Sequence, residues 1–131
     1  MNTSWDVRPE VILLVSTEDP TRELCRRILV AHGYMVLEAD NGFEALLVGS
    51  KHQGRVDLLL ADVALPRMSG ARLARAFELL WMRRLPVVYL GAAAGSRKPR
   101  IEVEGIPPAL LPSMLQSTVD GLLHSARPLV H

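Results

Sequence analysis

One acidic residue in this sequence stands where a reactive carboxylate could work. Asp62 follows the apolar run DLLLA at 57–61, and turn-forming dipeptides, LP and SG, come after it at 65–66 and 69–70. A carboxylate is a nucleophile in covalent catalysis and a ligand for hard cations, provided that its neighbours offset its negative charge. A carboxylate at the end of a buried strand therefore indicates a site, and its chemistry depends on those neighbours.

The neighbours of Asp62 are expected at the ends of other strands. In a parallel α/β sheet, ligands bind outside the carboxyl ends of the strands. Three such ends should converge here: the segment STED at 16–19 after the first strand, Asp62 after the third, and the dipeptide GA at 91–92 after the fourth. These residues are the candidate site.

Hydrophobic patterning predicts the elements that position this site. Short apolar runs predict five strands, at 11–15, 34–39, 57–61, 86–90 and 101–104. Helices are predicted after Pro20, at 41–54, after Gly70 and over the final apolar stretch that ends near 125. Strands that alternate with helices form right-handed crossovers, so we expect a parallel sheet covered on both faces.

Three segments carry finer predictions. In the helix after Gly70, the 3.6-residue period turns one set of residues to the core: Leu73, Ala76, Phe77, Leu80 and Trp81. The opposite face carries Arg72, Arg75 and Glu78. The segment 92–100 contains Gly95 and Pro99 and is too interrupted to predict a fourth helix, which we expect to be shortened or missing. The final helix has a broad apolar face that would suit a homodimer contact.

The composition fits one domain and argues against several partner classes. The chain has 131 residues, 49% of them hydrophobic and 5% aromatic, and its net charge is +1. We expect an N-terminal extension at 1–9, a domain at 10–125 and a tail at 126–131. Balanced charge gives no general attraction to nucleic acid or to anionic membranes, so neither is expected as a partner. The single cysteine and the lack of a signal peptide predict a cytoplasmic location.

Four motifs together resemble the receiver domain of bacterial response regulators. They are DVALPRMSG at 62–70, GY at 33–34, NGFEAL at 41–46 and LPVVYLGA at 85–92, in the strand–turn–helix contexts that the family shows. The resemblance covers about residues 10–92 and is weaker to 123. It implies a flavodoxin-like (CheY-like) doubly wound (βα)5 fold, a three-layer sandwich with a parallel five-stranded sheet.

The resemblance also implies a chemistry: a histidine kinase transfers a phosphoryl group to the aspartate that matches Asp62. In the family, two acidic residues after the first strand hold Mg²⁺, a hydroxyl after the fourth strand binds the phosphoryl group, and a lysine after the fifth pairs with it. Position by position, most of this set is missing. The acidic pair falls on Ser16 and Thr17, the hydroxyl position on Gly91, and the lysine position in GIPPA at 105–109.

Two interpretations of the acceptor site follow. In the first, Asp62 stands nearly alone with an ordinary pKa, and the chain is a degenerate receiver that acts through protein–protein interaction, with absent or inefficient phosphorylation. In the second, Glu18 or Asp19 supplies the missing charge, and a Mg²⁺ bound with Asp62 and the Ala64 carbonyl supports phosphorylation. Glu18 and Asp19 could instead only help to start the helix near Pro20.

Either interpretation predicts a non-enzymatic module. Its expected partner is a protein: a histidine kinase, a phosphotransfer protein or another regulator. An enzyme or nucleotide-binding protein on the same kind of sheet is a third alternative, but the first strand–helix turn, STEDPT, has no glycine-rich cradle for phosphates.

Overall fold

The computed structural model describes residues 9–52, 55–91, 100–101 and 111–124. Its elements, in chain order, are β1 (Val11–Val15), α1 (Asp19–Ala31), β2 (Met35–Ala39), α2 (Gly42–Lys51), β3 (Leu58–Asp62), α3 (Gly70–Trp81), β4 (Val87–Leu90), β5 (Arg100–Ile101) and α4 (Leu111–His124). Within these residues, no helix is long and apolar enough to cross a membrane.

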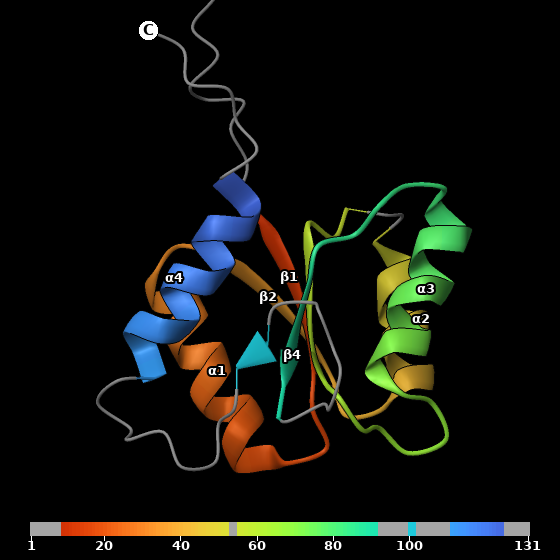
Figure 1. Ribbon diagram of the computed structural model, residues 1–131, viewed down its shortest axis with the longest axis horizontal. Coiled ribbons are helices and arrows are strands. Elements are labelled where there is room, and N and C mark those ends of the chain that lie inside the picture. Colours follow the sequence, from red (N-terminus) through yellow and green to blue (C-terminus); the bar gives the residue numbers. More distant parts are fainter. Residues whose placement is uncertain (1–8, 53–54, 92–99, 102–110, 125–131) are drawn as a thin grey trace, which may run out of the picture.

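The strands form one parallel sheet in the order β2-β1-β3-β4-β5. Helices α1 and α4 cover one face of the sheet, and α2 and α3 cover the other (Figure 1). The predicted doubly wound fold with a five-stranded parallel sheet is therefore confirmed. The strand order reverses between β1 and β3, which makes the carboxyl ends of these two strands the expected ligand position.

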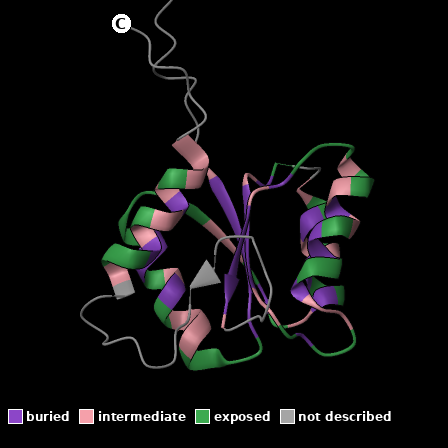
Figure 2. Ribbon diagram, viewed as in Figure 1, coloured by how far each residue is buried: buried purple, intermediate pink, exposed green. Residues whose placement is uncertain are grey.

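The central strands β1, β3 and β4 are buried on both faces, because helices lie on each side of the sheet (Figure 2). All five residues of β1 are buried, as its unbroken apolar sequence VILLV requires. Alternate strand residues point into two separate apolar clusters. Leu13 and Leu59 belong to the cluster under α2 and α3, and Ile12 and Leu60 to the cluster under α1 and α4.

The core-facing side of α3 differs from the prediction. Leu73, Ala74 and Phe77 are buried, whereas Leu80 is 57% exposed. The predicted place for Leu80 in the core is therefore wrong. Phe77 stacks on Trp81 with 4.5 Å between the ring centres, and both rings lie against Gly49 of α2.

Several boundaries also differ slightly from the sequence-based expectations. β3 includes Asp62 as its last residue, so the carboxylate belongs to the strand and not to the turn after it. β2 begins at Met35, one residue later than expected. The predicted fifth strand begins at Arg100, and the rest of it, 102–104, lies outside the described residues, as do 92–99, 105–109, most of the N-terminal extension and the tail.

Side-chain caps begin the two helices next to the site. The Asn41 side chain accepts a hydrogen bond from the Glu44 N–H at 2.8 Å, and the Ser69 hydroxyl accepts one from the Arg72 N–H at 3.2 Å. Each cap satisfies one of the backbone donors that a helix start leaves without a partner. The turn 63–69 between β3 and α3 is thus held at the end that faces Asp62.

Candidate functional site

The candidate phospho-acceptor, Asp62, is bound by the residue that follows the neighbouring strand. Its Oδ2 accepts a hydrogen bond from the Thr17 N–H at 3.0 Å, and the Thr17 hydroxyl lies 3.4 Å from the same oxygen. The pairing of β1 with β3 places Val15 beside Ala61, so the chain leaves β1 next to the end of β3. Thr17 therefore reaches Asp62 through the backbone as well as through its side chain.

Burial is the main influence on the Asp62 carboxyl, and it raises the pKa of this group above its usual value. The hydrogen bonds from Thr17 and Ser16 lower the pKa, and the nearby charge of Glu18 raises it. The expectation of an ordinary pKa was therefore wrong. The sequence shows an acid at the end of an apolar run, but the extent to which neighbouring strands and turns exclude water from it depends on the fold.

Ser16, which the sequence predicts at the first position of the family's acidic pair, is fully buried and forms hydrogen bonds with the local backbone. Its hydroxyl accepts a hydrogen bond from the Glu18 N–H at 3.3 Å, and its carbonyl accepts one from Arg22 Nη1 at 2.7 Å. Glu18 in turn accepts a hydrogen bond from the Thr21 hydroxyl at 3.1 Å. These contacts hold the 16–18 turn in place at the start of α1.

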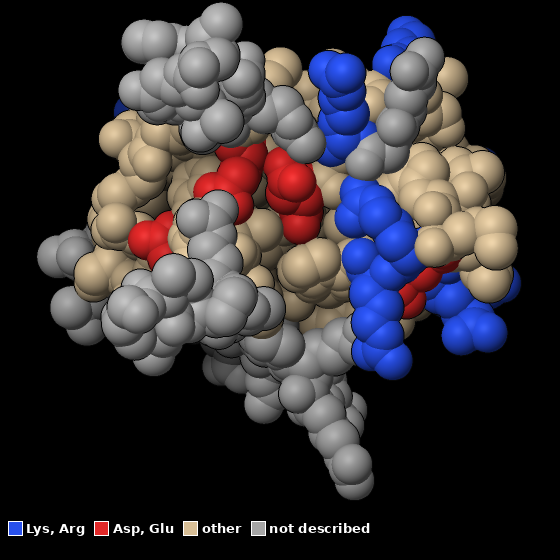
Figure 3. Space-filling model, turned by 90° about the horizontal axis from the view of Figure 1, so that it is seen from above, with Lys and Arg blue, Asp and Glu red and all other residues tan. Residues whose placement is uncertain are grey.

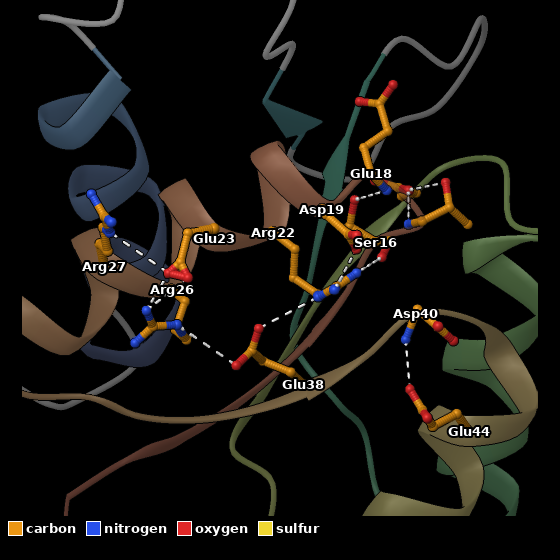
Figure 4. Close-up of polar contacts among 12 residues, drawn as sticks. Ser16, Glu18, Asp19, Arg22, Glu23, Arg26, Arg27, Glu38, Asp40 and Glu44 are labelled. Carbon is orange, nitrogen blue, oxygen red and sulfur yellow. Dashed lines mark hydrogen bonds and ion pairs between the residues drawn. The ribbon is translucent and has the colours of Figure 1, made fainter.

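Asp19, the other acid considered as a metal ligand, is paired with an arginine. Arg22 Nη2 lies 2.6 Å from Asp19 Oδ1, and Arg22 Nε lies 3.4 Å from Glu38 Oε1 on β2. The network continues along α1 through Arg26, Glu23 and Arg27 (Figure 4). Sequence reasoning missed Arg22. The Asp19–Arg22 spacing of three residues could have indicated the first pair, but nothing local indicates Glu38.

Gly91, which the sequence predicts at the position of the family hydroxyl, has a backbone conformation that suits glycine. It comes directly after β4, and its φ of +92° lies in the region that side chains rarely adopt. A Cβ built there would meet no atom within 4 Å among the described residues. Space for a side chain therefore exists, but the backbone conformation selects against one. A hydroxyl cannot be restored here without strain or a change in the turn.

A doubly wound five-stranded sheet, with an aspartate at the carboxyl end of β3 and a turn of the LPxxSG type after it, defines a signalling domain of the receiver class. The model of the response regulator receiver domain matches residues 12–103, and the chain belongs to this family. Receiver domains act in two-component signalling and interact with histidine kinases or other signalling proteins. They are typically non-enzymatic modules that bind Mg²⁺ at the phosphorylation site.

Individual relatives agree with this assignment. The chain is 30% identical over 92 residues to the polar-differentiation response regulator DivK of Brucella anthropi, a match that covers 66% of this chain and 69% of DivK. It is 42% identical over 64 residues to the sensor kinase CckA of Brucella abortus, covering 49% of this chain but only 7% of that much longer protein.

Solved structures give the same architecture. The receiver domain of a hybrid histidine kinase CckA is 29% identical, with a TM-score of 0.65 over 83% of this chain and 98% of that one. The chemotaxis protein CheY4 of Vibrio cholerae is 22% identical, with a TM-score of 0.68 over 85% of this chain and 99% of that one, a likeness of fold alone.

The described residues around Asp62 supply fewer available carboxylates than the acidic pair of the family's Mg²⁺ site: Glu18 lies close enough for its charge to raise the pKa of Asp62, but Asp19 is held by Arg22. Mg²⁺ requires an octahedral set of oxygens and is usually held by one or two carboxylates. In the part of the chain that the structure describes, no group of three acidic, histidine or cysteine residues could hold a metal ion. Asp19 is paired with Arg22, Ser16 and Thr17 are neutral, and Ala64, exposed in the turn after β3, adds only a neutral carbonyl.

Proposed function

We propose that this chain is a degenerate receiver domain that works in two-component or phosphorelay signalling through protein–protein interaction, with phosphorylation of Asp62 absent or inefficient. The observation that carries the proposal is the hydrogen bonding of Asp62 Oδ2 to Thr17, on the side where a receiver needs a metal cation. Its expected partners are a histidine kinase, a phosphotransfer protein or another regulator, and its expected location is the cytoplasm.

The chemistry of phosphoryl transfer supports this proposal. A carboxylate that attacks a phosphoryl group brings two anions together, and cations around the transferred group must offset the repulsion. Among the described residues, the negative charge of Glu18 acts on Asp62 and raises its pKa. The cation of Arg22 is engaged by Asp19, Glu38 and the Ser16 carbonyl. The groups that would accelerate the reaction are thus neutral, negative or occupied.

The test is a titration of the purified chain with Mg²⁺ and then beryllofluoride, followed by the amide NMR signals of Thr17, Asp62 and Gly91. We expect no response in the wild-type protein. The double variant Ser16→Asp/Thr17→Asp restores the acidic pair, and we expect it to gain Mg²⁺ binding. The variant Asp62→Asn is the control in both backgrounds, because it removes the acceptor and keeps the shape of the side chain.

One result would reverse the proposal. Mg²⁺-dependent shifts in the wild-type protein, lost in Asp62→Asn, would mean that Glu18 or Asp19 supplies charge to a working site. The chain would then be a phospho-acceptor receiver. Incubation with acetyl phosphate followed by intact-protein mass measurement gives an independent readout, because an acyl phosphate on Asp62 adds a fixed mass.

A further inference from the structure

The outer side of α3 combines cations with exposed apolar side chains. Arg72, Arg75 and Leu79 are spaced by three and four residues, so they lie along one side of α3, and all three are exposed, as is Met82 at the end of the helix. Leu79 is 66% exposed and Met82 is 89% exposed. We call these four residues, with the adjoining exposed Arg84, the α3 outer face.

The described part of the chain offers no ion pair that neutralises the cations of the α3 outer face. Among the ion pairs of the described residues, none includes Arg72, Arg75 or Arg84. Glu78 is the single acid of α3, and its Oε2 accepts a hydrogen bond from the Leu85 N–H at 2.9 Å. At the end of the molecule where α3 terminates, Lys and Arg side chains gather on the α2 and α3 side, and acidic ones lie mainly nearer α1 and α4 (Figure 3).

Met82 is held in this exposed position at a cost. Its φ of 53° is left-handed, a conformation that glycine usually takes at a helix end. Arg83 anchors the turn: its Nη2 donates to the Val56 carbonyl at 2.5 Å, and its guanidinium lies 5.3 Å from the centre of the Trp81 ring. A strained backbone that presents an apolar side chain to solvent is a feature expected of a binding site.

The chemistry of the face favours one class of partner. A nucleic acid would gain little from the apolar centre, and the Trp81 ring is covered by Phe77 and Arg83, so no base can stack on it. A membrane would receive few apolar side chains, because Leu73 and Phe77 of the same helix are buried in the core. A protein segment that carries both carboxylates and apolar residues complements the cations and the apolar centre together.

We propose that the α3 outer face docks an acidic, apolar segment of a partner protein. The inference rests on the proposed function, since it names the surface through which a receiver without working phosphorylation would act. Met82 and Leu79 would supply the apolar contact, and Arg72, Arg75 and Arg84 would orient the segment. The face is about 18 Å long, the length of a twelve-residue helix, which suits a helix of similar length as the occupant.

The test measures binding of the full chain to a synthetic amphipathic peptide of glutamate and leucine, by fluorescence anisotropy at low and physiological salt. The same peptide with lysine in place of glutamate is the sequence control. We expect the acidic peptide to bind and the basic one not to bind. The variant Arg75→Glu should weaken binding at least about tenfold, and added salt should weaken it further.

Two further variants separate docking from general effects. Arg27→Glu makes the same change of charge on α1, across the sheet, where Arg27 is 74% exposed, and it should alter the affinity by less than about twofold. Met82→Gly removes the apolar side chain and relieves the left-handed strain. We expect it to weaken binding by about threefold or more while the thermal midpoint stays unchanged or rises by ~3 °C.

Several outcomes would overturn the docking proposal. These are no binding of the acidic peptide at millimolar concentration, equal losses in Arg75→Glu and Arg27→Glu, or binding only to phosphatidylserine vesicles or to duplex DNA. The Asp62→Asn variant distinguishes the two proposals. Peptide binding that requires phosphorylated Asp62 would contradict the proposed function and support the docking face. An Asp62 that is not phosphorylated, together with no peptide binding, would support the proposed function and contradict the docking face.

Discussion

The polar groups at the carboxyl end of β3 and those on the α3 outer face differ in whether they have partners among the described residues. At the carboxyl end of β3, the polar groups bind one another: Asp62 accepts hydrogen bonds from Thr17, Ser16 from Glu18, and Asp19 from Arg22. On the α3 outer face, the guanidinium groups of Arg72 and Arg75 have no acidic partner among the described residues. The polar groups around Asp62 therefore bind one another, whereas the arginines of the α3 outer face remain available to a partner.

Arg22 on α1 and Arg75 on α3 show the same difference for a single residue type. Arg22 is 19% exposed and lies within ion-pairing distance of acids on α1 and β2. Arg75 is exposed and has no such neighbour in the described chain. An arginine that is paired and partly buried contributes to folding, whereas an unpaired surface arginine contributes charge to its surroundings. The α1 network therefore stabilises the fold, whereas the arginines of α3 remain available to an external partner.

Gly70→Ala should have the largest effect on the free energy of unfolding, because Gly70 lies where the start of α3 contacts the end of β3. A Cβ on Gly70 would lie 2.4 Å from the Asp62 carbonyl oxygen and 3.1 Å from the Tyr89 ring. The backbone cannot yield easily, so we expect a loss of about 2–3 kcal/mol in the free energy of unfolding, measured by urea denaturation. Gly121→Ala on α4 is the matched control.

That control should change stability in the other direction. A Cβ on Gly121 meets no atom within 4 Å among the described residues, and alanine favours an exposed helix interior by about 0.5–1 kcal/mol. Equal effects of the two substitutions would show that the contact between α3 and the end of β3 is looser than the distances indicate.

The second prediction tests the difference between Arg22 and Arg75. Arg22→Met should lower the free energy of unfolding by about 1–2 kcal/mol, because it leaves the Ser16 carbonyl and Asp19 without their cation and Glu38 with Arg26 alone. Arg75→Met should change it by less than about 0.5 kcal/mol. Thermal and urea unfolding of both variants decide the matter, and a large loss in Arg75→Met would contradict the unpaired state of the α3 outer face.

The third effect is the pH dependence of stability that Asp62 imposes. Its folded pKa is raised above the unfolded value, so the folded state binds the proton more tightly, and this group's contribution to stability falls as pH rises between the two values. Asp62→Asn removes that decline. Relative to wild type, the variant should therefore be more stable at pH 7 than at pH 3. Urea unfolding at several pH values tests this, and a constant difference would exclude burial as the cause.

The smallest effect concerns Thr17→Val, which removes the hydroxyl and keeps the N–H. The lost contact is long, 3.4 Å, and exposed, so we expect a change of no more than about 0.5 kcal/mol in stability. Because the Thr17 hydroxyl lowers the pKa of Asp62, the variant should raise that pKa further, which NMR titration of the Asp62 carboxyl carbon measures. An unchanged pKa would leave the backbone N–H as the whole of the Thr17 contribution.

Local patterns in the sequence determined the alternation of strands and helices, the parallel sheet and the position of Asp62 at the end of β3. These features are readable because apolar periodicity and turn residues act within a few positions of the chain. The assignment of Ser16 and Thr17 to the positions of the family's acidic pair rests on the motif alone and stays a prediction. The predicted limits of the domain, 10–125, stay a prediction.

The contacts and the exposure of the side chains on these elements depend on the tertiary structure. Thr17 binds an aspartate 45 residues away, and Arg22 binds Glu38 on a different strand. Leu80 is exposed, although its spacing placed it in the core, whereas Phe77 of the same helix is buried and stacks on Trp81. Periodicity fixes which residues share a face of a helix. Which part of that face loses its water, and which charge finds a partner, depends on what the other elements place against it.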